Sequence, residues 1–117
     1  MTQLALKRVY EPRAETDGAR ILVDRLWPRG IAKTAVDLWL KDIAPSNDLR
    51  RQFHGQPDRW EEFRAAYAAE LGAAPAMAAL GLLNERLKAG PVTLLYAARD
   101  AQYNNAVALK LWLEKRG

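Results

Sequence analysis

The segment 20–30 (RILVDRLWPRG) contains the first group of side chains capable of chemistry. An apolar run ends at Asp24, and Arg25, Trp27 and Arg29 follow without regular spacing. The planar guanidinium group of arginine suits phosphate and carboxylate, which it can bind through two parallel hydrogen bonds. Three arginines and one nearby lysine against a single aspartate leave this region at +3. We therefore predict an anion site here, with four ligand-binding residues: Arg20, Arg25, Trp27 and Arg29.

A structural interpretation of the same segment stays open. In it, Asp24 accepts backbone N–H groups or pairs with one of the neighbouring arginines, and Trp27 fills the core beside Pro28. We favour the anion site, because one aspartate cannot neutralise all of these cations. In that interpretation Asp24 orients the arginines, and Arg25, Arg29 and Arg99 hold the anion.

A second segment, 96–105 (YAARDAQYNN), links an apolar run to a helix expected to begin at Asn104 or Asn105. The first turn of a helix presents free N–H groups and a partial positive charge, which favour a bound anion. The segment lacks the glycines of a Walker A or dinucleotide-binding loop. In the structural alternative, Asn104 caps the helix and Arg99 pairs with Asp100. The predicted ligand-binding residues are Arg99, Asp100, Asn104 and Asn105.

His54 is the single histidine of the chain and lies near the end of a short expected helix. Histidine is the side chain that ordinarily changes charge near neutral pH, so it is the best general acid or base available. We predict His54 and Asp24 as the catalytic candidates, provided that the fold brings them together. A lone histidine is more often a capping or packing residue, and whether the protein is an enzyme stays open.

The composition excludes several classes of protein. The 117 residues include no cysteine, which excludes thiolate nucleophiles, disulfides and cysteine-bound zinc. One histidine and scattered carboxylates form no metal-ligand set, so we expect no metal and no cofactor. No signal peptide is recognisable, and no apolar run approaches the roughly 20 residues that cross a bilayer. We expect a cytoplasmic protein without a membrane partner and with a single domain over residues 1–117.

The basic charge leaves two other functions open. The net charge is +4, the isoelectric point is about 9.6, and 12 arginines outnumber 6 lysines. One alternative is nucleic-acid binding through an arginine-rich face, with Trp27 as the exposed aromatic. The other is a non-catalytic interaction module, because the chain shows no clear nucleophile. Our leading interpretation is a small protein that binds a phosphate-bearing or other anionic ligand at the carboxyl ends of its strands.

The secondary-structure pattern predicts an α/β fold, with a small, mostly parallel sheet of three to four strands flanked by helices. Strands are expected over 4–10, 20–24 and 91–97, and a fourth over 36–43, where a helix also fits. A short helix, capped by Ser46, Asn47 or Asp48, is expected to run through Arg50 to about His54. Further helices are expected over 58–71 and 75–89 and from 104 or 105 onward, with Trp60, Phe63 and Tyr67 as core residues. In a parallel sheet the segments after 20–24 and 91–97 lie at the same edge.

Several motifs together resemble the YeaO-like family, which is grouped as domain of unknown function 488. The resemblance covers nearly the whole chain, and its most specific part is Leu-Val-Asp-Arg-Leu-Trp-Pro-Arg-Gly at 22–30. It implies a small cytosolic bacterial α/β protein and supplies no established activity. Wider relatives carry a cysteine in the last strand–loop–helix, whereas this chain has Tyr96 and no cysteine there, so nucleophilic cysteine chemistry is not carried over. Tyr103 stands where relatives carry a histidine. The motifs are KRVY at 7–10, RILVDRLWPRG at 20–30, WLKDIAPS at 39–46, FH at 53–54, WEEF at 60–63, Tyr67, EL at 70–71, TLLYAARD at 93–100 and NNA at 104–106.

Overall fold

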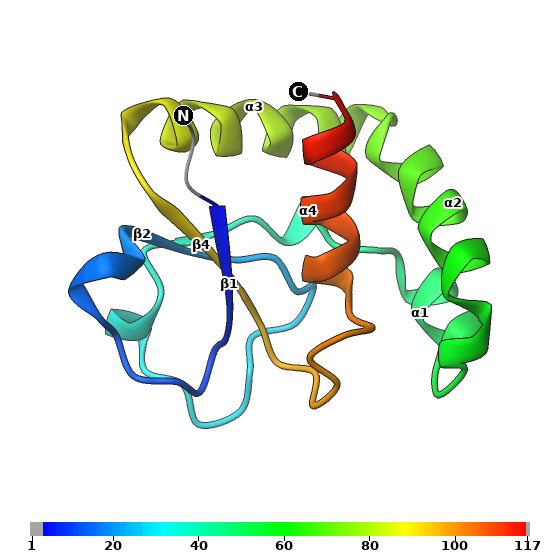
Figure 1. The fold of residues 1–117 in the computed structure, drawn as a ribbon, viewed down its shortest axis with the longest axis horizontal. Coiled ribbons are helices and arrows are strands. Elements are labelled where there is room, and N and C mark those ends of the chain that lie inside the picture. Colours follow the sequence, from blue (N-terminus) through cyan, green and yellow to red (C-terminus); the bar gives the residue numbers. More distant parts are fainter. Residues whose placement is uncertain (1–3, 117) are drawn as a thin grey trace.

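A parallel sheet forms the centre of the protein in a computed structural model that describes residues 4–116. Its four strands lie in the order β1-β4-β2-β3, and every pair of neighbours is parallel (Figure 1). The predicted α/β class and parallel sheet are therefore confirmed, and the ambiguous segment 36–43 supplies a short fourth strand. The strands are β1 (Leu4–Arg8), β2 (Ala19–Leu22), β3 (Leu38–Trp39) and β4 (Val92–Tyr96).

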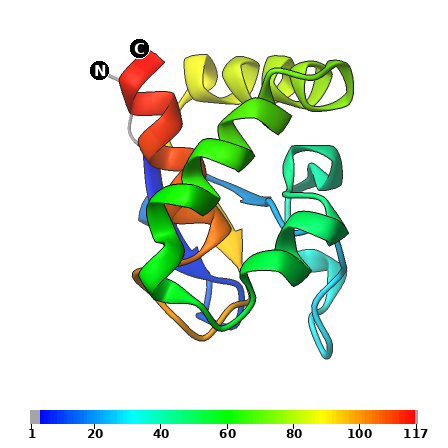
Figure 2. The ribbon, with the colours of Figure 1, turned by 90° about the vertical axis from the view of Figure 1, so that its right-hand side faces the viewer.

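Four α-helices flank the sheet, near the predicted positions (Figures 1 and 2). The helix expected from 58 begins as a 3-10 turn at Pro57–Arg59 and continues as α2. No single described helix is long and apolar enough to cross a membrane; α2 with its preceding turn and α3 reach that length only as a pair bent by 88°. The helices are α1 (Asn47–Phe53), α2 (Trp60–Leu71), α3 (Ala74–Ala89) and α4 (Asn105–Arg116).

The two faces of the sheet are covered differently. Alternate residues of a strand point to opposite faces, so Ile21 and Leu94 lie in one apolar cluster and Leu22 and Leu95 in another. The first cluster contains residues of all four helices. The second contains none from a helix in the described chain and is closed by loop residues such as Trp27. Helices therefore cover one face, and loops with 3-10 turns cover the other.

A buried ionic cluster lies on the loop-covered face, at the start of β2. Asp17 is 5% exposed and Arg20 is 1% exposed. The Asp17 carboxylate accepts hydrogen bonds from Lys7 Nζ at 3.0 Å and Arg20 Nη1 at 2.8 Å. Arg20 also donates to the carbonyl oxygens of Ala35 and Glu11. The guanidinium group is thus held by three separate segments of the chain.

Gly18, which follows this cluster, is required by the geometry of the turn. Its φ of 64° lies in the left-handed region of backbone conformation, which residues other than glycine rarely adopt. A Cβ atom at this position would lie 2.1 Å from the carbonyl oxygen of Pro91. This close approach brings Ala19 N to Pro91 O at 3.0 Å and starts the pairing of β2 with β4.

The carboxyl ends of β2 and β4 meet at one edge of the sheet, as the sequence predicted. In Figure 1 this edge lies at the bottom, with the loop after β2 in light blue and the loop before α4 in orange, whereas α3 crosses the top. Helix α1 is fixed near this edge by its N-cap residue, Ser46, whose hydroxyl accepts from Leu49 N. The Glu70 carboxylate of α2 in turn accepts from the N–H and hydroxyl of Ser46 at 2.8 and 2.6 Å.

Candidate functional site

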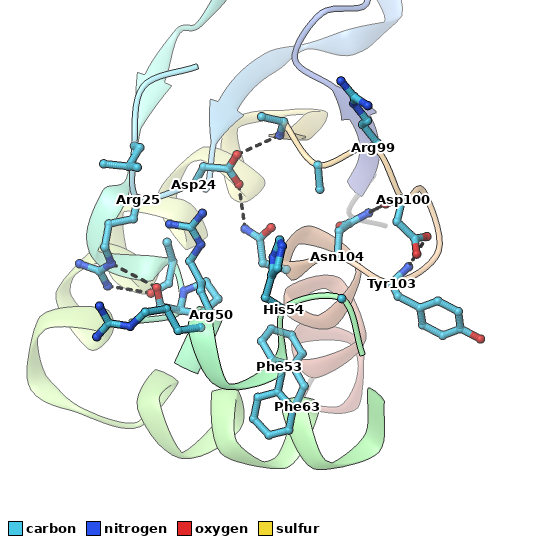
Figure 3. A pocket seen from close by; sticks show the side chains of 18 of the residues that line it. Asp24, Arg25, Arg50, Phe53, His54, Phe63, Arg99, Asp100, Tyr103 and Asn104 are labelled. Carbon is cyan, nitrogen blue, oxygen red and sulfur yellow. Dashed lines mark hydrogen bonds between the residues drawn. The ribbon is translucent and has the colours of Figure 1, made fainter. Parts of the chain in front are cut away.

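A pocket of about 890 Å³ opens at this edge of the sheet (Figure 3). It is lined by the loop after β2, the loop between β4 and α4, and helix α1 with the turn that follows it. Both cationic loops therefore border the same pocket, as expected from their position at one edge of a parallel sheet. Nine of the ten predicted site residues contribute to it: Asp24, Arg25, Trp27, Arg29, His54, Arg99, Asp100, Asn104 and Asn105.

Asp24 is half-buried in the pocket and is held by neutral donors. Its Oδ2 accepts from the backbone N–H of Ala97 at 2.9 Å, and its Oδ1 accepts from the side-chain amide of Asn105 at 3.0 Å. Burial raises the pKa of Asp24; these two hydrogen bonds and the positive charge of Arg50 oppose the rise without cancelling it. Asp24 therefore joins the loop after β2 to the end of β4 and the start of α4.

Asn105 is the residue that ties Asp24 to α4. Its side-chain amide donates to the carbonyl oxygen of Val23 at 2.9 Å as well as to Asp24. The Asp24 carboxylate consequently lies at the first residue of α4, where the helix dipole favours a negative charge. The sequence predicts a bound anion at this helix end, and the structure places the chain's own carboxylate beside it.

Arg25 is held by backbone carbonyl oxygens. Its Nε donates to Pro45 O at 3.1 Å, and its Nη2 donates to Ala44 O at 2.9 Å. The expectation that Asp24 orients the arginines is not matched, because no described arginine donates to Asp24. The guanidinium group of Arg25 fixes the segment before α1 through these two hydrogen bonds, and the Arg25 side chain also lines the pocket.

Arg50 is a pocket residue that the sequence analysis did not select. It lies in the last turn of α1, is exposed, and acts on the pKa of Asp24 through its charge. His54 lies four residues further along the chain, directly after the last residue of α1, and both side chains line the pocket. Figure 3 shows both below Asp24. This four-residue spacing was the available signal, but the sequence did not show that α1 faces the strand ends.

Arg29 and Arg99 lie at the outer parts of the pocket, and both are exposed. In Figure 3 Arg99 lies across the pocket from Arg25, and its side chain points away from His54. Within the described chain neither side chain has a hydrogen bond or an ion pair. The alternative in which Arg99 pairs with Asp100 is therefore not what the structure shows.

Asp100 and Asn104 shape the loop before α4. Asp100 Oδ1 accepts from the backbone N–H groups of Gln102 and Tyr103 at 2.9 and 3.0 Å. Asn104 caps α4, because its Oδ1 accepts from Val107 N at 2.9 Å and its amide donates to Asp100 O. Both residues line the pocket, but these side-chain groups hold the loop itself.

Arg20 does not reach the pocket. It lies at the start of β2, and its guanidinium group is occupied by the cluster around Asp17. Trp27 lines the pocket but is half-buried: its indole N–H donates to Ile31 O, and its ring packs edge-on against Trp39 at 5.5 Å. The exposed aromatic expected for nucleic-acid binding is therefore not found at Trp27.

Aromatic side chains form one side of the pocket. Phe53, Trp60, Phe63 and Tyr103 all contribute to the lining. The sequence analysis interpreted Trp60 and Phe63 as core residues because of their helical spacing. Both also pack against the helix-covered core, but each remains half-buried and borders the pocket. The spacing of these residues in the sequence predicted that they share one face of α2. Only the folded structure shows that this face also borders the pocket.

Comparison with known proteins identifies the family. The sequence profile described as the inactive DUF488-N3 subclade matches residues 3–117. The chain belongs to the DUF488 family. The uncharacterised protein YeaO of Escherichia coli (strain K12) is 48% identical to this DUF488 chain over 109 residues, covering 92% of this chain and 93% of YeaO. An uncharacterised protein of Mycobacterium tuberculosis (strain ATCC 25618 / H37Rv) is 42% identical over 117 residues, covering 98% and 97% of the two chains.

No solved structure gives a significant match to this DUF488 protein. The family match confirms the resemblance predicted from the motifs. The relatives carry no assigned activity in their names, so the chemistry of the site rests on the geometry described above.

Proposed function

We propose that this DUF488-family protein binds a phosphate-bearing or similar anionic ligand in the pocket at the carboxyl ends of β2 and β4. One observation carries the proposal. Among the arginines whose side chains the structure describes, four have no hydrogen bond or ion pair, and three of these line the pocket: Arg29, Arg50 and Arg99, with Arg86 outside it.

The charge of the pocket supports an anionic ligand. Its lining contains five arginines against two aspartates, a net charge of +3 in a chain whose total is +4. Arg51 is the one of these arginines that pairs with an acid, Asp48, and both partners are exposed. In a concave site, cations without internal partners raise the local concentration of anions and provide charge-assisted hydrogen bonds.

Binding is better supported than turnover. Asp24 and His54 line the same pocket, but they are not hydrogen-bonded to each other in the described chain, and Asp24 is already held by Ala97 and Asn105. The chain has no cysteine to act as a nucleophile. The matching subclade is described as inactive. We therefore propose that His54 contacts the ligand and that Asp24 positions the loop after β2 against the end of β4 and the start of α4. We also propose that the protein is cytoplasmic.

The test compares two arginines in similar settings. Arg50 and Arg86 each lie in the last turn of a helix, and both are exposed. We expect titration with inorganic phosphate, followed by NMR, to give saturable shifts of backbone amides at the pocket. Arg50→Gln is expected to weaken binding by about tenfold or more, because a hydrogen bond to a charged group contributes roughly 1.5–3 kcal/mol. Arg86→Gln is expected to bind as the wild type does. Absence of saturable shifts, or equal effects of the two substitutions, would contradict the proposal.

A further inference from the structure

The pocket is larger and more aromatic than a site for a bare anion needs to be. Pockets of about 300–1,000 Å³ typically hold whole organic ligands and combine apolar and aromatic walls with a few polar groups. This pocket, at about 890 Å³, lies in that range. We infer that its ligand is a phosphate monoester carrying a flat aromatic ring, with the phosphate at the arginines and the ring against the aromatic wall formed by Phe53, Trp60, Phe63 and Tyr103.

The aromatic wall is a continuous set of ring contacts. Trp60 packs edge-on against Tyr103 at 5.3 Å between ring centres and stacks on Phe63 at 5.7 Å. Phe63 contacts Phe53 edge-on at 5.8 Å. The residues come from α1, α2 and the loop before α4, so three separate segments fix the wall. Rings packed in this way lose little conformational entropy when a ligand ring stacks on them.

The aromatic and cationic groups are joined through α1. Arg50 and Phe53 lie in the last turn of α1, His54 is the residue that ends this helix, and all three line the pocket. A cation, a ring and an imidazole therefore border the same space. Tyr103 is 44% exposed, so part of the wall remains available to a ligand.

This inference rests on the proposed anion-binding function and adds the part of the ligand that is not the anion. Four small molecules separate the two claims: inorganic phosphate, ribose 5-phosphate, adenosine and adenosine 5′-monophosphate. Ribose 5-phosphate and the monophosphate share the sugar phosphate and differ in the ring, whereas adenosine has the ring without the charge. Dissociation constants from calorimetry or NMR titration give the comparison.

We expect adenosine 5′-monophosphate to bind about tenfold or more tightly than ribose 5-phosphate, in line with the measured effect of stacking a base on an aromatic side chain. Adenosine is expected to bind more weakly than the monophosphate by at least a similar factor. In NMR spectra the ring is expected to shift the indole N–H signal of Trp60.

Tyr103 and Met77 provide a variant and its control. Tyr103 contacts Trp60 in the wall, whereas Met77 lies on α3 outside the pocket; they are 44% and 50% exposed. Tyr103→Leu is expected to remove much of the preference for the monophosphate over ribose 5-phosphate, and Met77→Leu is expected to retain it. Trp60→Leu tests the same wall from α2, and Tyr103→Leu answers the question if the Trp60 variant does not fold.

Each outcome decides between the two claims. Equal binding of ribose 5-phosphate and the monophosphate would overturn the ring inference and leave anion binding in place. Equal effects of Tyr103→Leu and Met77→Leu on the preference would also overturn it. If adenosine binds as tightly as the monophosphate, the phosphate adds nothing beside the ring and the inferred ligand is overturned. If no phosphate compound binds, both claims are overturned.

Discussion

Two pairs of aspartate and arginine flank strand β2 and behave in opposite ways. At its start, Asp17 and Arg20 are buried and hydrogen-bonded to each other at 2.8 Å. Just after its end, Asp24 accepts from neutral donors, while Arg25 donates to carbonyl oxygens. The same two residue types within ten positions of the chain thus build a closed ionic cluster in one case and an open pocket in the other.

The pKa values of the two aspartates record this difference. Burial alone would raise the pKa of Asp17, but hydrogen bonds from Ala14 N–H, Lys7 and Arg20 outweigh it and lower the pKa to about 2. Burial also raises the pKa of Asp24, and its hydrogen bonds do not outweigh that effect. Charged donors stabilise a carboxylate more than neutral donors do.

Unpaired positive charge of the described chain lies near Asp24, whereas the cations near Asp17 are paired. Around Asp17 the cations Lys7 and Arg20 both pair with the same carboxylate inside the fold, so their donors are occupied within the protein. Around Asp24 the arginines Arg29, Arg50 and Arg99 have no internal partner in the described chain. Their charges are available to a molecule from outside.

The largest expected effect is a difference in unfolding free energy between a variant in the buried cluster around Asp17 and a variant in the pocket. Arg20→Met is expected to lower the free energy of unfolding by about 3–5 kcal/mol, because it removes one of the two cations paired with the buried Asp17 carboxylate and leaves Ala35 O and Glu11 O without this donor. Arg29→Met, in the pocket, is expected to change it by less than about 0.5 kcal/mol, because that side chain is exposed and unpaired. Urea unfolding measures both, and similar losses for the two variants would break the comparison.

The acid dependence of stability gives the next largest effect. The folded-state pKa of Asp17, about 2, is below its unfolded value of 3.8. Its contribution is therefore present above about pH 4 and is lost as the pH falls toward 2, a change of about 2 kcal/mol at 1.4 kcal/mol per pKa unit. We expect the difference in unfolding free energy between the wild type and Asp17→Asn to narrow over this interval.

Asp24 provides the control for that titration, because its shift has the opposite sign. Its folded-state pKa is raised, so it favours the folded state most when protonated and loses that contribution as the pH rises through the folded pKa. The stability of Asp24→Asn relative to the wild type is therefore expected to increase with pH. The same direction of change in both variants would show that the two aspartates are not in contrasting environments.

The smallest expected effect concerns ligand affinity. Asp24→Asn is expected to strengthen phosphate binding by about threefold to tenfold, since it removes a like charge several ångströms from the ligand at an intermediate dielectric constant. Glu85→Gln removes the same charge from an exposed position of α3 outside the pocket and is the control. Weaker binding by Asp24→Asn would instead assign Asp24 to the ligand contacts or to holding the loop open.

The fold was largely predictable, and the site was predictable in part. Apolar runs without alternation identified β2 and β4, and Ser46 was among the predicted caps of α1. Arg50 was missed because the position of α1 depends on Ser46 and Glu70, which are 24 residues apart and hydrogen-bonded. A contact of that range leaves no local pattern in the sequence.

The sequence by itself determined the order of strands and helices, the family, and the arrival of two cationic loops at one edge of a parallel sheet. Hydrophobic patterning is sufficient for the order of the elements along the chain, the geometry of parallel sheets places the two loops at one edge, and the sequence motifs carry the family. Only the tertiary structure decided which charges remain unpaired. Ion pairing depends on distances across the fold, so Arg20 became part of the core while Arg50 entered the pocket. The segment 20–30 is therefore divided between a buried half before β2 ends and a half after it that borders the pocket.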